Sequence, residues 1–146
     1  MSKTLYITCG IPGSGKSTWA KRKVEEGWSW NSRDEIRFSL VAEHEDYFSR
    51  EEKVYDTFIS NIQNDIYDGF ENIIADATHL NERARKQLLD RISLLGYEVI
   101  YVYFDISLDT AIERNNKREG RAKVPETVIK KMYNSLTFPA GNVKEL

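Results

Sequence analysis

Near its amino end, the sequence places glycines, one lysine and hydroxyl side chains at a spacing that suits phosphate binding. Residues 10–18 read GIPGSGKST and fit the pattern G-x-x-x-x-G-K-[ST]. Glycines let such a loop curl so that backbone N–H groups point at phosphate oxygens, and the following helix adds the positive end of its dipole. Lys16 would reach the β- and γ-phosphates. We therefore predict a site for ATP and Mg²⁺, with Ser17 as the metal contact and nucleotide contacts at Gly10, Pro12, Gly13, Ser14, Gly15, Lys16, Ser17 and Thr18.

Two aspartates follow short segments that look like strands. Asp34 comes shortly after the alternating residues 28–30, and Asp76 ends the apolar run 72–75. The carboxyl ends of parallel strands are where ligands bind in α/β sheets. Asp34 could be a general base that accepts the proton of an incoming hydroxyl, or it could cap the next helix. Asp76 could hold Mg²⁺ or its waters, bond the loop hydroxyl, or serve in a cap or turn.

Three further polar residues lie near these carboxylates and are candidates for binding the acceptor. Arg37 lies one helical turn after Asp34 and could hold a phosphate or a carboxylate. Thr78 and His79 follow the apolar run and could touch the acceptor at the same edge. Arg37 could instead be a solvated arginine and His79 a structural histidine, and Arg33 is expected on the surface.

A short basic stretch between two expected helices is typical of a lid. Residues 114–124 contain Arg114, Arg118, Arg121 and Lys123. Arg118 could reach the γ-phosphate in a closed state and stabilise charge in the transition state, so Asp34, Lys16 and Arg118 are the catalytic candidates. Arg114 could contact the adenine or the phosphates. A solvated run of charges is the alternative.

Apolar spacing predicts strands that alternate with helices. Strands are expected over residues 4–9, 28–30, 72–75 and 98–104. Helices are expected over 16–26, from about 34 to 41, over 54–66 after a capping box at Ser49–Glu52, and over 81–95, 107–117 and 125–136. This order predicts a three-layer α/β domain with a short parallel sheet of about four strands. We expect one domain over residues 1–146, with a lid at about 114–124 and a frayed tail at 137–146.

Composition narrows the class of protein. The formal net charge of -2 and the pI of about 5.8 give no global basic field of the kind that marks nucleic-acid binding. The single cysteine, Cys9, cannot form a disulfide framework or a cysteine metal site. We see neither a signal peptide nor a long apolar run, and we expect a cytoplasmic protein with no membrane association.

Four segments together resemble a known family. The segments GIPGSGKSTWA, NSRDEIR, IADATHLNERAR and RNNKREGRAKVPETVIKKMY resemble, in this order, the kinase domain of phage polynucleotide kinase and its P-loop relatives, including AAA-like and zeta-toxin-like kinases. Those enzymes transfer the γ-phosphate of ATP to the 5′-hydroxyl of DNA or RNA. The similarity covers about residues 3–136, and the second and fourth segments are far more specific than the phosphate loop alone.

The resemblance implies a role for each candidate on the donor side. By this likeness Lys16 and Ser17 are the phosphate and Mg²⁺ contacts. Arg118 matches the lid arginine on the transferring phosphate, and Arg114 matches an earlier lid arginine near the nucleotide. ATP and Mg²⁺ are the implied cofactors.

On the acceptor side the likeness is less complete. Asp34 matches the general base of the family, Arg37 the arginine that grips the 3′-phosphate of the acceptor, and Asp76 the carboxylate that shapes the acceptor pocket. The family's Asp-Thr-Asn is replaced here by Asp-Ala-Thr-His at residues 76–79, and the lid holds an extra residue, Glu119.

Three functions follow as hypotheses. The first is a 5′-hydroxyl polynucleotide kinase, with a single-stranded 5′ end of nucleic acid as acceptor and a role in repair. The second is a kinase for a small hydroxylated metabolite, which the acidic pI favours. The third is a nucleotide-binding module without turnover, against which the presence of Lys16, Asp34 and Arg118 argues.

Overall fold

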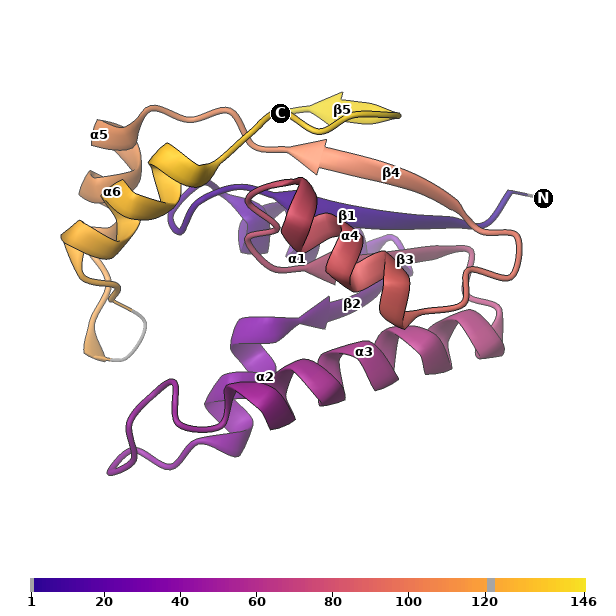
Figure 1. Cartoon of the computed structure of the whole chain (residues 1–146), viewed down its shortest axis with the longest axis horizontal. Helices are drawn as coiled ribbons and strands as arrows, with labels where there is room; N and C mark the ends of the chain where they lie inside the picture. Colours follow the sequence, from indigo (N-terminus) through magenta and orange to yellow (C-terminus); the bar gives the residue numbers. More distant parts are fainter. Residues whose placement is uncertain (1, 121–122) are drawn as a thin grey trace.

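The computed structural model describes residues 2–120 and 123–146, so Arg121 of the basic stretch lies outside the described residues. In this part of the chain, five parallel strands form one sheet in the order β2-β3-β1-β4-β5. The strands are β1 (Thr4–Cys9), β2 (Ser29–Ser32), β3 (Asn72–Asp76), β4 (Glu98–Tyr103) and β5 (Val143–Glu145). Helices flank the sheet (Figure 1), which confirms the α/β fold class expected from the sequence.

The two faces of the sheet are covered by different helices. One face packs against α3 (Glu51–Asp68) and α4 (Glu82–Arg91), and the other packs against α1 (Lys16–Glu25). Apolar side chains of both faces are fully buried, which accounts for the near-continuous apolar runs of the central strands. The first face buries Leu5, Ile7, Phe58, Ile62, Ile73 and Leu88.

Three helices lie beyond the carboxyl ends of the strands, two on one side and one on the other (Figure 1). On one side, α5 (Leu108–Asn116) and α6 (Glu126–Ser135) share a small core with Ile11 of the phosphate loop. On the other side lies α2 (Arg33–Leu40), which packs against α3. Figure 1 shows this separation at the left of the molecule, so the loop after β1 lies between two projecting parts of the chain.

Two helix boundaries differ from the sequence-based expectation. The apolar spacing predicts α4 to reach about Leu95, but α4 ends at Arg91. The side chain of Gln63 on α3 accepts from Ser93 N at 2.7 Å and donates to Ser93 O at 3.1 Å, which uses backbone groups that a longer helix would need. The expected capping box at Ser49–Glu52 is also wrong, because α3 begins at Glu51 with no side-chain cap.

The tail is the largest difference from expectation. Residues 137–146 were expected to fray, but Val143–Glu145 form β5 beside β4. Tyr101 N donates to Asn142 O at 2.9 Å and Leu146 N donates to Tyr103 O at 2.8 Å. These bonds are non-local and leave no periodic pattern in the sequence. Among the described residues, no helix combines the length and apolar character that a membrane crossing needs.

Candidate active site

The loop between β1 and α1 has the backbone of a phosphate cradle. Gly15 has a φ of 101° and precedes the first turn of α1, and Gly13 has a φ of 83°. A Cβ at Gly13 would lie 2.7 Å from the carbonyl oxygen of Ala111 on α5. Both positions therefore require glycine, one for the left-handed turn into the helix and the other also for close packing.

Polar groups of this loop suit an anion. Lys16 Nζ donates to Gly10 O and Ile11 O, both at 2.9 Å, so the ammonium lies across the loop. The Ser14 hydroxyl oxygen is buried and has no hydrogen-bond partner among the described residues. Ser17 and Thr18 are exposed in the first turn of α1, and Pro12 is half-buried. A phosphate group would satisfy these donors, so the residues fit a nucleotide.

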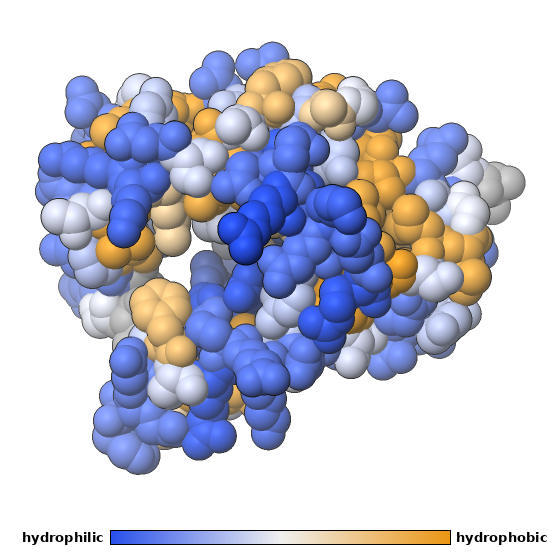
Figure 2. Space-filling model, viewed as in Figure 1, coloured by the Kyte–Doolittle hydropathy of each residue, from blue (hydrophilic) through white to orange (hydrophobic). Residues whose placement is uncertain are grey.

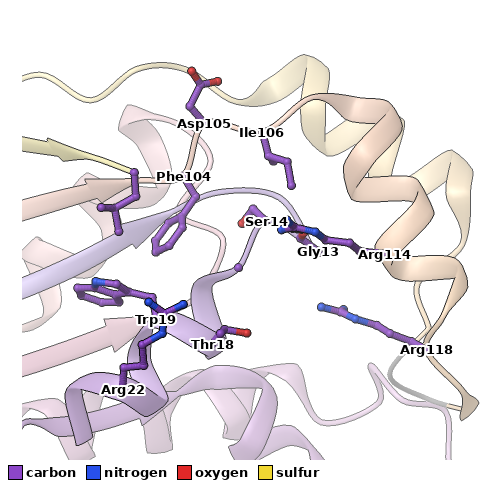
Figure 3. A pocket seen from close by; sticks show the side chains of 12 residues that line it. Gly13, Ser14, Thr18, Trp19, Arg22, Phe104, Asp105, Ile106, Arg114 and Arg118 are labelled. Atoms are coloured by element: carbon purple, nitrogen blue, oxygen red, sulfur yellow. Dashed lines mark hydrogen bonds between the residues drawn. The ribbon is translucent and has the colours of Figure 1, made fainter. Parts of the chain in front are cut away.

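A cleft opens next to this loop. Its volume is about 580 Å³. Figure 3 shows the guanidinium groups of Arg114 and Arg118 extending from one wall toward the loop, with the Trp19 and Phe104 rings on the opposite side. Arg114 Nη1 also donates to Gly13 O at 3.3 Å. The remaining lining residues are Gly13, Ser14, Gly15, Thr18, Arg22, Asp105, Ile106 and Leu146.

Asp76 lies at the carboxyl end of β3, buried beside the phosphate loop. Its Oδ2 accepts from Trp30 Nε1 at 2.9 Å, and its Oδ1 accepts from Thr8 Oγ1 at 3.4 Å. Burial raises the pKa of this carboxyl group, while the charge of Lys16 and the bond from Trp30 act in the opposite direction. Asn81, not Asp76, caps α4, so the carboxylate is not used as a helix cap.

Asp34 and Arg37 form a pair on α2. Arg37 Nη1 donates to Asp34 Oδ1 at 2.5 Å. The Asp34 side chain is 68% exposed, whereas the Arg37 side chain is 8% exposed. The N-cap of α2 is Ser32, whose hydroxyl accepts from Glu35 N at 3.2 Å. The structure therefore removes the helix-cap alternative for Asp34 and leaves its carboxylate open to solvent.

Glu51, the first residue of α3, holds Arg37 in place. Its carboxylate accepts from Arg37 Nε and, at 3.0 Å, from Arg37 Nη2. Burial by itself would lower the pKa of the Arg37 guanidinium, but hydrogen bonds with Glu51 and Tyr47 and the charge of Asp34 raise it above its usual value. Arg37 is therefore a fixed cation that orients Asp34.

Arg33 is expected on the surface, but its side chain is only 32% exposed. Its Nη2 donates to Glu51 Oε2 at 3.1 Å, and its guanidinium lies 4.9 Å from the centre of the Tyr55 ring. Its Nε is buried. Both arginines of the Arg-Asp-x-x-Arg segment thus pair with Glu51, a residue that the sequence analysis did not single out because it lies in a different helix.

The segment after β3 supports the site through hydrogen bonds. His79 is 6% exposed, and its Nδ1 lies 2.8 Å from Thr8 O, so this nitrogen carries the proton. Burial lowers the pKa of His79 from 6.5 to about 4. Thr78 is half-buried, and its carbonyl accepts from Gly10 N at 3.0 Å. Arg85, which is 1% exposed, donates to His79 O at 3.0 Å.

The candidates therefore converge on one region. Burial is the largest influence on the Lys16 pKa and lowers it. The negative charges of Asp76 and Asp34 act in the opposite direction, and the positive charge of Arg118 lowers the Lys16 pKa further. These four side chains come from four different elements or loops. Trp30, Glu51 and Arg85 complete the arrangement and were missed, because each acts through a partner distant in sequence. In the described residues, no group of three or more acidic, histidine or cysteine side chains could hold a metal ion by itself.

The loop, the sheet order and the residues at its carboxyl edge define a P-loop nucleotide-binding protein. Residues 5–139 match the model of a family described as AAA domain, and the chain belongs to this family. This membership confirms the resemblance to P-loop kinases that the motifs indicate and implies ATP as ligand. Membership of this family also supports phosphotransferase activity.

Several known proteins are similar to this chain in sequence or in fold. A protein of Autographa californica nuclear polyhedrosis virus, provisionally named a bifunctional polynucleotide kinase/RNA ligase, is 28% identical over 144 residues. The aligned part is 90% of this chain but only 20% of that protein. A chain of the Pnkp1/Rnl/Hen1 RNA repair complex superposes with a TM-score of 0.78 at 24% identity, over 92% of this chain and 44% of that one.

A sugar kinase from Janibacter sp. HTCC2649 superposes with a TM-score of 0.69 at 18% identity, over 99% of this chain and 84% of that one. Kti12 of Chaetomium thermophilum in complex with ADP-AlF3 superposes with a TM-score of 0.72 at 15% identity, over 97% of this chain and 88% of that one. The solved structures share the fold with this chain, and the fold is compatible with more than one acceptor.

Proposed function

We propose that this chain transfers the γ-phosphate of ATP to the 5′-hydroxyl of a polynucleotide. The arrangement of Asp34, an exposed carboxylate that is free of a capping role, carries the transfer to a hydroxyl. Asp34 is held by Arg37 at 2.5 Å, in electrostatic reach of Lys16. A general base must be oriented toward the acceptor and remain open to it, and Asp34 meets both conditions. The 28% identity to the viral polynucleotide kinase/RNA ligase favours a polynucleotide as the acceptor.

On the donor side, the phosphate loop would bind the β- and γ-phosphates. Lys16 would exchange its bonds to Gly10 O and Ile11 O for charged phosphate oxygens, and Ser14 Oγ would gain the partner that it lacks. Mg²⁺ would neutralise charge on the phosphates, with the Ser17 hydroxyl as its contact from this chain. Arg114 and Arg118 would add positive charge from the lid side of the cleft.

On the acceptor side, Asp34 would take the proton of the 5′-hydroxyl as its oxygen attacks the γ-phosphorus. The new O–P bond forms as the bond between the γ-phosphorus and the ADP oxygen breaks. Arg37 would orient Asp34 and face the phosphate on the 3′ side of the acceptor. Asp76 and Thr78 would form the wall beside Lys16, while the buried His79 would serve this wall as a structural residue.

A kinase for a small hydroxylated metabolite is the second candidate. The formal net charge of -2 favours it, as does the superposition on a sugar kinase, which covers 84% of that kinase's chain. The two candidates share the donor site and Asp34, and they differ in the acceptor alone. We further propose that residues 1–146 form one such kinase domain, with the connection between α5 and α6 as its lid.

The first experiment measures transfer of labelled γ-phosphate from Mg-ATP to a single-stranded 5′-hydroxyl oligonucleotide. The same oligonucleotide with a 5′-phosphate is the control, and gluconate and hexoses form a parallel set of acceptors. Label on the 5′-hydroxyl oligonucleotide alone supports the proposal. Label on a sugar alone refutes it in favour of the second candidate.

The variant Asp34→Asn tests the general base. It should retain ATP affinity and lose about 10²-fold or more in turnover. Glu35→Gln is the matched control, because Glu35 is the neighbouring exposed carboxylate in the same helical turn. Equal turnover in both variants would show that Asp34 does not act as the base.

A further inference from the structure

The connection between α2 and α3, residues 41–50, brings aromatic rings to the Asp34–Arg37 pair. The guanidinium carbon of Arg37 lies 5.2 Å from the centre of the Tyr47 ring and 5.2 Å from that of the Phe48 ring. The two rings meet edge to face, with centres 5.0 Å apart. The cation is thus held by aromatic faces as well as by carboxylates.

Phe48 differs from Tyr47 in its exposure to solvent. Phe48 is 53% exposed, whereas Tyr47 is half-buried. The amide of Phe48 donates to Asp46 Oδ1 at 3.2 Å, which fixes the backbone of the turn. Among the large exposed apolar side chains of the described residues, Phe48 is the one whose ring contacts Arg37. Figure 2 shows apolar atoms of this projecting part of the molecule at the edge of a hollow on the left.

We propose that Phe48 is a stacking platform for the nucleobase of the 5′-terminal nucleotide of the acceptor. The proposal rests on the proposed function and names the part of the acceptor that this site recognises. A base that stacks on Phe48 lies next to Arg37, and the 5′-hydroxyl of the same nucleotide is then near Asp34. Every base has a flat π face, so the platform accepts any of the four bases.

The charges around the platform limit what it can hold. Glu43, Glu45 and Asp46 lie in the same connection, and of these Glu45 pairs with Arg50 at 3.0 Å. This local excess of negative charge repels a phosphate backbone. The connection therefore suits an uncharged base, while the phosphates leave in another direction. A nucleobase presents a flat π face to Phe48, which a sugar or sugar acid lacks.

The test compares two single-stranded 5′-hydroxyl oligonucleotides of the same sequence. In one of them, the first nucleotide carries a tetrahydrofuran in place of its base-bearing sugar and keeps both the 5′-hydroxyl and the 3′-phosphodiester. The kcat/KM of phosphate transfer is measured for both. Wild-type protein should favour the complete oligonucleotide by about tenfold or more, as stacking of one base provides. In Phe48→Ala and in Phe48→Leu, which keeps apolar volume without a π face, the preference should fall to about twofold or less.

Phe70→Ala is the matched control. Phe70 is 42% exposed and lies just before β3, at the amino end of the sheet and away from the site. This variant should keep the wild-type preference. Equal rates of wild-type protein on the two oligonucleotides would overturn the platform. A preference that survives in both Phe48 variants would also overturn it. Either result would leave the proposed polynucleotide kinase activity intact. Transfer to neither oligonucleotide would overturn the kinase proposal and the platform with it.

Discussion

Replacement of His79 by asparagine should change how the stability of this protein depends on pH. His79 has a φ of 38°, a backbone region that asparagine adopts more readily than most residues. The asparagine side-chain amide can replace the Nδ1–H that lies 2.8 Å from Thr8 O. His79→Asn therefore removes a titrating group with little change to the local structure.

The size of the effect follows from the pKa of His79. Burial lowers this pKa from 6.5 to about 4, and Arg33, Arg85 and Lys16 add positive charge that further disfavours the imidazolium. Because the folded-state pKa is depressed, the stabilising contribution is present above the unfolded-state value and is lost as the pH falls toward 4. Between about pH 7 and pH 5, the linkage relation gives a loss of about 2 kcal/mol from this residue alone.

Urea unfolding of both proteins at about pH 7 and pH 5 measures the effect. Wild-type protein should lose about 2 kcal/mol more of its free energy of unfolding than His79→Asn over this interval. The comparison cancels the carboxylates that both proteins share. An equal loss in the two proteins would refute the burial of a neutral His79. It would also restore the histidine as a solvent-accessible candidate for binding the acceptor.

Two other substitutions test the supports of the site. Arg85→Met should lower the free energy of unfolding by about 3 kcal/mol or more, because three backbone carbonyls lose the charged donor that a 1% exposed arginine provides. Urea unfolding at neutral pH measures this, and wild-type stability would show that these bonds contribute nothing. Lys16→Ala should weaken ATP binding and phosphate transfer together, as measured by nucleotide titration and by the transfer assay, and normal ATP affinity would contradict the phosphate-loop assignment.

The sequence alone predicts the architecture well, because strong local patterns specify it. Strands β1, β3 and β4 are mainly apolar runs, and Gly27 and Gly69 follow the ends of α1 and α3 with positive φ angles. The helix caps at Asn81 and Ser107 also agree with the sequence pattern. Failures occur where tertiary contacts override these patterns. The Gln63 side chain ends α4 early, and the pairing of β5 depends wholly on the neighbouring strand.

The residues of the candidate site divide in the same way. Motif spacing identifies Lys16, Asp34 and Arg37 as members of one site, and they converge in the structure. The sequence does not show which carboxylate holds Arg37, since Glu51 follows only after a ten-residue connection, residues 41–50. Burial of His79 is equally hidden, because an isolated histidine in a turn carries no signal of its surroundings.

Strand β5 has a consequence for the solubility of the protein. Strand β4 reads EVIYVY, in which five apolar, β-branched or aromatic residues follow Glu98 without glycine or proline. Such a segment is prone to pair with copies of itself when its backbone edge is open. The three residues of β5 cover the carboxyl-terminal half of that edge, residues 101–103, and their own outer edge is short, with exposed Lys144 and Glu145. The tail thereby protects this half of the edge from edge-to-edge self-association.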